Sequence, residues 1–382
     1  MKHLSIFGGC LGAAVLMLTA GAAMAETRID VEVAPDAPKL ERMATDELAA
    51  GLNRLFADVD VRVRAGVPES AKGLRILVGS PATNPSVKSV AADRWPTVSD
   101  QGIVLKSVDS NGRRCLVVGG GSPAATFWAA GELGHRLGVR SLLHGDIFPK
   151  DKYPADSIGE RLGGFDVVME PTLRTRTWRT INDFAVGPES WGLNDQRKLF
   201  RQLAKLKFNR VMLSIYPWQP FIDYEFDGVK KQTGVLWYGE TYRIDGDTPG
   251  RAAFGGARFF ENPDFAGLAS YDEMAAAGQK HMQGLIDAAR ELGMSVGISI
   301  SPLEFPREFA AALPGARDAT GLKNLTITAG APQSPDDAVL RDLAKAQIRA
   351  LLETYSGVDV LYLSMPEFPE WQEHAEAAWR RL

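Results

Sequence analysis

The stretch that decides the fold is VDVLYLSMPEFPEW, residues 358–371. It opens as an apolar run rich in β-branched and aromatic residues, which is the pattern of a strand buried on both faces. Pro366 cannot donate a hydrogen bond to a sheet and disfavours helix at Met365, so the strand should stop near Ser364. Glu367 then follows the C-terminal end of the strand, where βα-repeat proteins frequently hold catalytic carboxylates.

A second acid, Glu370, lies close by, and the two acids sit among Phe368, Pro369 and Trp371. Apolar and aromatic surroundings disfavour the charged form of a carboxyl, which raises its pKa towards the range of a general acid. We favour Glu367 as the catalytic acid and treat Glu370 and Trp371 as substrate-binding candidates. The alternative is a solvated loop with one stray aromatic residue.

Three earlier segments repeat the same strand-then-helix form. The predicted strands are 173–181, 210–215, 294–300 and 358–364, and the predicted helices are 194–207, 271–292 and 336–355, with a fourth helix beginning at 370. Four successive βα units are typical of half of an eight-stranded TIM-type (β/α)8 barrel. A doubly wound open sheet is the alternative, but polar and aromatic residues follow all four strands, as convergence on one barrel mouth requires.

Half a barrel would leave two unpaired strand edges beside a large apolar interior. We therefore expect residues 166–382 to be a truncated catalytic barrel whose C-terminal half is missing. Such a fragment alone should be inactive.

The predicted strand ends supply residues suited to binding a sugar. The substrate-binding candidates are Arg179, Asp183, Trp218, Glu304, Glu370 and Trp371. Aromatic rings stack on sugar faces, while arginine and carboxylates hydrogen-bond hydroxyl groups or a carboxylate. Each also has a simpler explanation, because Trp218 could belong to the core and Arg179 could pair with Asp183 or Glu170.

Residues 26–165 precede these units and predict a small α/β accessory domain. The predicted strands are 29–33, 59–63, 74–78, 102–108 and 114–118, and the predicted helices are 38–56 and 124–137. The glycine turn at 119–123 could suggest a phosphate-binding loop and an open-sheet enzyme. We reject that interpretation, because Ala124 replaces the third glycine, Pro123 removes a backbone donor, and Ser122 as a helix cap explains the turn.

The N-terminus has the pattern of a secretory signal peptide over residues 1–25. A basic start at Lys2, an apolar segment at 6–20 and small residues at Ala23 and Ala25 fit a cleaved leader. We expect an extracytoplasmic protein, periplasmic or secreted, that is not held in a membrane after cleavage. Cys115 would be the only cysteine left, and its apolar strand predicts a buried, inert thiol.

The charge balance gives no reason to expect nucleic acid as a partner. The chain has 43 basic and 47 acidic residues and a formal net charge of −4. The four histidines that follow the leader are too scattered to form pairs of metal ligands. We expect neither a metal nor a cofactor.

Two segments carry a resemblance to known enzymes. ATFWAAGELGHRLGVRSLLHGDIFP, residues 125–149, resembles the end of the α/β domain that precedes the barrel in family 67 α-glucuronidases and family 20 β-hexosaminidases. MPEFPEW, residues 365–371, resembles a segment of related secreted glycoside hydrolases. In that group the general acid follows the fourth strand, which implies Glu367, and an arginine after the first strand commonly binds the sugar, which implies Arg179.

One departure from the group bears on the reaction. Hexosaminidases that use the acetamido group of the substrate carry Asp-Glu at the fourth strand, whereas this chain has Pro366-Glu367. The resemblance therefore favours an α-glucuronidase-like hydrolase that inverts the anomeric centre, with bases from later strands. A β-N-acetylhexosaminidase-like hydrolase and a non-catalytic carbohydrate-binding protein remain alternatives. Acids after the sixth and seventh strands of the full-length gene would favour an enzyme.

Overall fold

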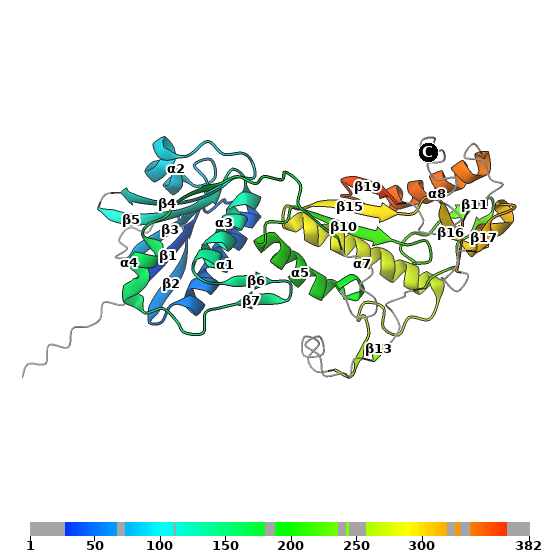
Figure 1. Ribbon diagram of the computed structural model, residues 1–382, viewed down its shortest axis with the longest axis horizontal. Helices are drawn as coiled ribbons and strands as arrows, with labels where there is room; N and C mark the ends of the chain where they lie inside the picture. Colours follow the sequence, from blue (N-terminus) through cyan, green and yellow to red (C-terminus); the bar gives the residue numbers. More distant parts are fainter. Residues whose placement is uncertain are drawn as a thin grey trace, which may run out of the picture.

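The structure is a computed structural model that describes residues 27–66, 73–110, 112–179, 188–235, 242–243, 257–318, 325–328 and 337–364. The fold is α/β. Figure 1 shows two units arranged along the long axis of the molecule, each built around its own sheet.

The first unit contains a six-stranded sheet in the order β2-β1-β3-β5-β4-β8. The strands are β1 (Thr27–Val33), β2 (Val59–Ala65), β3 (Leu74–Val78), β4 (Ile103–Ser110), β5 (Arg113–Gly120) and β8 (Asp166–Met169). Strands β2, β1, β3 and β5 are parallel, while β4 is antiparallel to both β5 and β8. All five strands predicted for this part of the chain are confirmed.

Helices cover both faces of this sheet. They are α1 (Lys39–Leu55), α2 (Pro85–Ala91), α3 (Pro123–Arg136) and α4 (Ile158–Leu162), with 3-10 turns at Ala92–Arg94 and Ala155–Ser157. Helices α1 and α3 pack on one face in the main core, whereas α2 packs on the other face in a small cluster that includes the buried Cys115. The glycine turn has the expected structural role, because Ser122 caps α3 by accepting a hydrogen bond from the N–H of Ala125 at 3.1 Å.

Two features of the first unit extend beyond the prediction. Strand β8 joins the first sheet, so this sheet includes residues 166–169, which the sequence analysis assigned to the second unit. Strands β6 (Arg140–Leu142) and β7 (Gly145–Ile147) form a hairpin after α3. Gly138 ends that helix with a φ of 96°.

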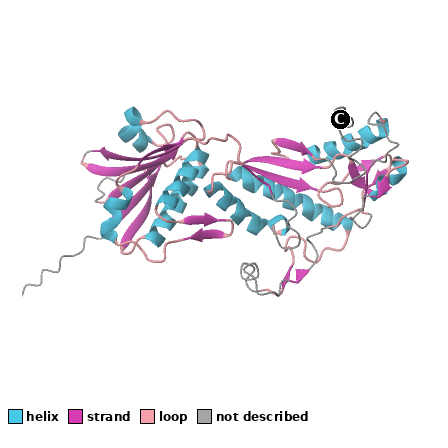
Figure 2. Ribbon diagram, viewed as in Figure 1, coloured by secondary structure: helices cyan, strands magenta, loops and turns pink. Residues whose placement is uncertain are grey.

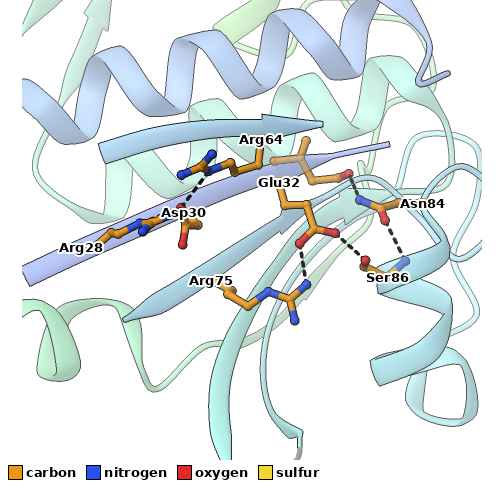
Figure 3. Close-up of polar contacts among 8 residues, drawn as sticks. Arg28, Asp30, Glu32, Arg64, Arg75, Asn84 and Ser86 are labelled. Carbon is orange, nitrogen blue, oxygen red and sulfur yellow. Dashed lines mark hydrogen bonds and ion pairs between the residues drawn. The ribbon is translucent and has the colours of Figure 1, made fainter. Parts of the chain in front are cut away.

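Buried acids on β1 are neutralised by arginines from β1 itself and from the neighbouring strands β2 and β3 (Figure 3). Asp30 accepts hydrogen bonds from Arg28 and Arg64, and Glu32 accepts hydrogen bonds from Arg75 and from the hydroxyl of Ser86. Both carboxylates are buried. Burial of a charge is tolerated only with such partners, so these pairs fix the arrangement of β1, β2 and β3.

The second unit contains a four-stranded parallel sheet whose strands follow one another in sequence order. They are β9 (Thr177–Arg179), β10 (Arg210–Ile215), β15 (Ser295–Ile300) and β19 (Val360–Leu363). The helices are α5 (Leu193–Lys205), α7 (Tyr271–Glu291) and α8 (Ala338–Thr354), with 3-10 turns at Pro188–Ser190 and Arg307–Ala312. The predicted order of the four strands is confirmed.

The prediction that β19 is buried on both faces is wrong for the described residues. Residues 360–362 of this strand are half-buried, and Leu363 is 41% exposed. The reason is that β19 is an edge strand of the described sheet, with β15 as its one strand partner there. Strand β9 is also shorter than the predicted 173–181 in the described part of the chain.

The two faces of the second sheet differ in chemistry. One face is aliphatic and packs against α5 and α7 in the main core; its residues on β10 and β15 are Val211, Leu213, Ile215, Val296, Ile298 and Ile300. Side chains alternate along a strand, so the intervening residues form the second face. That second face is largely polar and begins with Arg210 and Ser295.

Ion pairs connect the first unit to α5. Lys205, at the end of α5, lies between Glu47 of α1 at 2.8 Å and Asp146 of the hairpin at 2.7 Å. Lys207 pairs with Glu132 of α3 at 2.8 Å. These contacts place the first unit beside the amino ends of β10 and β15, as Figure 2 also shows.

Candidate functional site

The candidate site lies at the carboxyl ends of the strands in the second sheet. In Figure 1, β10 and β15 run away from the first unit and end beside a cluster of short strands. These are β11 (Glu225–Phe226), β12 (Val229–Lys230), β16 (Glu304–Pro306), β17 (Arg317–Asp318) and β18 (Thr326–Thr328). A further pair, β13 (Tyr242–Arg243) and β14 (Phe259–Phe260), lies apart from them at the lower edge of Figure 1. They belong to the long segments that follow β10 and β15, and long ordered segments at strand ends are where functional residues concentrate.

A stacked aromatic pair follows β10. The rings of Tyr216 and Trp218 are parallel within 9°, with centroids 4.7 Å apart. Trp218 is 6% exposed, whereas Tyr216 is half-buried. Trp218 therefore backs the tyrosine ring from the core side, and Tyr216, which the sequence analysis did not rank as a substrate contact, is the more accessible of the two rings.

A buried lysine organises the segment that carries this pair. Lys231 is 1% exposed, and its ammonium donates hydrogen bonds to the carbonyls of Gln219 at 2.6 Å and Ile222 at 2.9 Å. Burial lowers the pKa of Lys231 to about 7, an effect that the nearby carboxylates of Glu308 and Asp223 oppose. Lys231 thus anchors the chain immediately after the aromatic pair.

Glu308 joins the segment after β10 to the segment after β15. Its carboxylate accepts hydrogen bonds from the N–H of Gln232 at 2.6 Å and from the hydroxyl of Thr233 at 2.6 Å. Next to it, the ring of Phe309 stacks on Tyr224 with centroids 5.0 Å apart. The two segments therefore form one packed assembly over the carboxyl end of the sheet.

Glu304, at the start of β16, is a buried carboxyl at this end of the sheet. It is 4% exposed and accepts a hydrogen bond from the hydroxyl of Thr326 at 2.7 Å. Burial raises the pKa of Glu304 to about 7, because the hydrogen bond from Thr326 compensates only in part for the lost hydration. A carboxyl with this pKa can hold or release a proton near neutral pH.

Hydroxyl groups line the carboxyl end of the polar face of the sheet. The hydroxyls of Ser299 and Ser364 are 2.6 Å apart, and the hydroxyl of Ser301 donates to the carbonyl of Ser364 at 3.3 Å. Ser214 lies beside Ser299 in the register of β10 and β15. Arg179 belongs to the same face, because it pairs in register with Met212, and it is exposed.

The amino end of the same face is closed by side chains. Arg210 donates to the hydroxyl of Ser295 at 2.8 Å and to that of Tyr362 at 3.3 Å. The Tyr362 ring lies over Gly297, where a Cβ atom would come within 2.4 Å of it. In the described part of the chain, these side chains cover the amino end of the polar face.

The structure brings three of the predicted site residues, Arg179, Trp218 and Glu304, to the carboxyl ends of neighbouring strands. The other four, Asp183, Glu367, Glu370 and Trp371, lie outside the described residues. Their roles stay predictions.

Sequence reasoning missed Lys231 and Glu308. Lys231 bonds main-chain carbonyls of its own segment, and Glu308 bonds a main-chain N–H of the segment after β10. No motif or spacing in the sequence signals such contacts.

Within the described ranges, no group of three or more His, Cys, Asp or Glu side chains could hold a metal ion. His281 instead pairs with Asp264, with Nδ1 and the carboxylate oxygen 2.7 Å apart. The hydrogen bond with His281 and the bond from the N–H of Leu193 hold the pKa of Asp264 below its ordinary value, although partial desolvation of the carboxyl opposes this shift. None of the helices in this part of the chain combines the length and apolar character needed to cross a membrane.

Comparisons with known proteins return structures but no sequence relatives. No family model and no curated protein matches the chain. The similar solved structures include a family GH115 4-O-methyl-α-glucuronidase with specificity for decorated arabinogalactans, at 14% identity and a TM-score of 0.47 over 90% of this chain and 36% of the other. They also include an N-acetyl-β-hexosaminidase from Streptomyces plicatus, at 16% identity and a TM-score of 0.45 over 92% of this chain and 57% of the other.

A third similar structure is a family GH20 β-N-acetylhexosaminidase from Streptomyces coelicolor A3(2), at 13% identity and a TM-score of 0.48 over 92% of this chain and 58% of the other. The chain thus spans less than two thirds of the length of each of these proteins. The neighbours are glycoside hydrolases, and an α-glucuronidase and β-hexosaminidases, the two enzyme types that the sequence resembles, are among them. All three TM-scores lie below 0.5.

Proposed function

We propose that the chain is part of an extracytoplasmic glycoside hydrolase that cleaves oligo- or polysaccharide by α-glucuronidase-like inversion, with Glu367 as the general acid. The observation that carries the proposal is the group of residues at the carboxyl ends of the parallel strands. An exposed arginine, a stacked aromatic pair and a carboxyl with a pKa of about 7 follow three neighbouring strands. This combination fits a sugar that bears a carboxylate.

The second sheet fits the first half of a (β/α)8 barrel. Its four strands are parallel and in sequence order, and the helices pack on its aliphatic face. In a barrel the opposite face points inward, and active sites form at the carboxyl ends of the strands. The polar face that ends in Ser214, Ser299 and Ser364 would then line the barrel interior below the site.

Each candidate residue has a separate role in binding the substrate. The guanidinium of Arg179 binds the carboxylate of the sugar, and the Tyr216 ring, supported by Trp218, stacks on a sugar face. Glu304, protonated below about pH 7, hydrogen-bonds a sugar hydroxyl. Asp183, Glu370 and Trp371 complete the substrate contacts. Inverting hydrolysis also needs a second carboxyl group to activate water, which we place after later strands of the full-length protein.

The test uses the full-length protein and its Glu367→Gln variant. The substrates are a glucuronic-acid-decorated oligosaccharide and an aryl α-glucuronide whose leaving group needs no proton. Loss of proton donation should slow turnover of the oligosaccharide by roughly 10² to 10⁴-fold and largely spare the aryl substrate. Glu370→Gln is the matched control and should have a much smaller effect. Equal activity of the two variants on the oligosaccharide would refute the assignment of Glu367.

The same assay separates the alternative functions. Turnover of an aryl N-acetyl-β-glucosaminide, but not of the glucuronide, would indicate a β-N-acetylhexosaminidase-like enzyme. Saturable binding of the oligosaccharide without turnover of any glycoside would indicate a carbohydrate-binding protein. Mass spectrometry of the exported protein tests its location, because cleavage after Ala25 leaves Glu26 as the first residue.

A further inference from the structure

A cavity of about 120 Å³ lies between the first unit and α5, far from the carboxyl ends of the second sheet. Its walls are formed by α1, α3, the β6–β7 hairpin and the last residue of α5, which lie together in Figure 1. Most of its lining is apolar: Leu48, Ala50, Leu52, Leu55, Phe127, Ala130, Leu137, Val139 and Phe148. Cavities with such walls tend to exclude water and to accept apolar ligands.

Glycines on the two helices keep this space open. Gly51 of α1 lines the cavity, and a Cβ atom placed on it would meet no heavy atom within 4 Å. Gly134 of α3 also lines it, and a Cβ atom there would come no closer than 3.8 Å to Val139. Glycine is unfavourable inside a helix. Two helical glycines that face the same unfilled space therefore indicate that the cavity itself has a use, because a larger side chain at either position would fill it.

The mouth of the cavity is polar. Glu47, Ser141, Asp146 and Lys205 contribute to its lining, and Lys205 bridges the two carboxylates. Ser141 donates to Asp146 at 2.9 Å. Glu47 also pairs with Arg201. A carboxylate has about four lone-pair sites, so Glu47 and Asp146, with two such partners each, keep capacity to accept a further hydrogen bond.

We propose that this cavity is a binding site for a small phenol-type ligand, with the aromatic ring inside the apolar walls and the hydroxyl group at the mouth. The volume of about 120 Å³ is somewhat below the roughly 150 Å³ of an apolar cavity that admits benzene, so the ring would fill the apolar part and the hydroxyl group would lie at the open mouth. The hydroxyl group of the ligand donates a hydrogen bond to the carboxylate of Asp146 or Glu47. An apolar pocket with few polar groups at one end is the usual form of a small-molecule site. The site is independent of the carbohydrate function proposed above.

The experiment is a titration of the whole protein with phenol, followed by NMR chemical shifts and by the midpoint of thermal unfolding. Saturable binding is expected in the natural protein. Gly51→Leu should fill the cavity and weaken phenol binding at least tenfold, while raising the unfolding midpoint of the ligand-free protein. Gly159→Leu is the matched control, because Gly159 is also helical with no atom within 4 Å of an added Cβ, yet lies outside this cavity.

Each outcome decides the proposal. Saturable binding to the natural protein and to Gly159→Leu, together with its loss in Gly51→Leu, supports the site. Should Gly51→Leu fail to fold, Gly134→Val fills the same cavity from α3 and serves in its place. Absence of saturable binding to the natural protein, or equal binding to the cavity-filled variant, overturns the proposal.

Discussion

Replacing Glu304 by glutamine should remove a large pH dependence from the stability of the protein. Glu304 is buried, and its pKa rises from 4.5 to about 7 on folding. At about 1.36 kcal/mol for each pKa unit, this change corresponds to roughly 3 kcal/mol of folding free energy. Between these two pKa values the folded protein keeps a proton on Glu304 that the unfolded chain releases.

This retained proton determines how the unfolding free energy changes with pH. The stabilisation from a protonated Glu304 is complete below pH 4.5 and is lost as the pH rises through about 7. The natural protein should therefore lose roughly 3 kcal/mol between pH 4.5 and about pH 8 from this group alone. Glutamine has nearly the same shape, can still accept the hydrogen bond from Thr326, and does not titrate, so the variant should lack this loss.

The assay is urea unfolding of both proteins at the two pH values, followed by circular dichroism. The quantity compared is the difference in unfolding free energy between pH 4.5 and pH 8, because other groups that titrate in this range contribute equally to both proteins. Glu353→Gln, at an exposed position of α8, controls for the loss of a surface charge. If Glu304→Gln and the natural protein lose the same free energy, burial does not hold this carboxyl neutral and the reasoning is wrong.

Three further predictions concern other charged side chains that are paired or buried. Arg75→Met leaves Glu32 buried without its arginine and should lower the unfolding free energy by about 3–5 kcal/mol. Adding Glu32→Leu should restore most of the lost unfolding free energy. A double variant as unstable as the single variant would contradict the prediction. The unfolding free energy of the natural protein should rise between pH 7 and 10.5, because the unfolded chain keeps a proton on Lys231 that the folded protein releases. Lys231→Met should remove this rise. Unfolding curves of both proteins at the two pH values test the prediction. Asp264→Asn should remove stabilisation that is present above pH 3.8 and is lost as the pH falls through the lower pKa of the folded carboxyl; calorimetry at pH 7 and pH 3 should show the two proteins converging in acid.

The sequence was sufficient to predict the elements with strong local signals. Helix α7 illustrates this, because Ser270 and Glu273 form a capping box at its start and apolar residues recur at helical spacing along it. The parallel strands β10 and β15 were equally clear, since their continuous apolar runs are bounded by turns. Their order in the sheet followed from the repeated strand and helix units.

Features that depend on distant contacts could not be predicted in this way. Strand β8 has four residues of alternating exposure, and its partner β4 precedes it by about sixty positions, so no local pattern marks it as part of the first sheet. The burial of Trp218 depends on the ring of Tyr216 and on the packing of two long segments. Lys231 resembles any surface lysine in sequence, because its partners are carbonyl groups.

The contact between α3 and α5 has a practical consequence for how the protein can be attached to a surface. A Cβ atom on Gly131 would lie 3.1 Å from the carbonyl oxygen of Lys205, so the two helices meet backbone to backbone. The first unit is thereby fixed at the end of the second sheet opposite the candidate site (Figure 1). Immobilisation on a sensor chip through the first unit would orient the carboxyl ends of β10 and β15 towards the flowing solution, whereas coupling near α8 would block them.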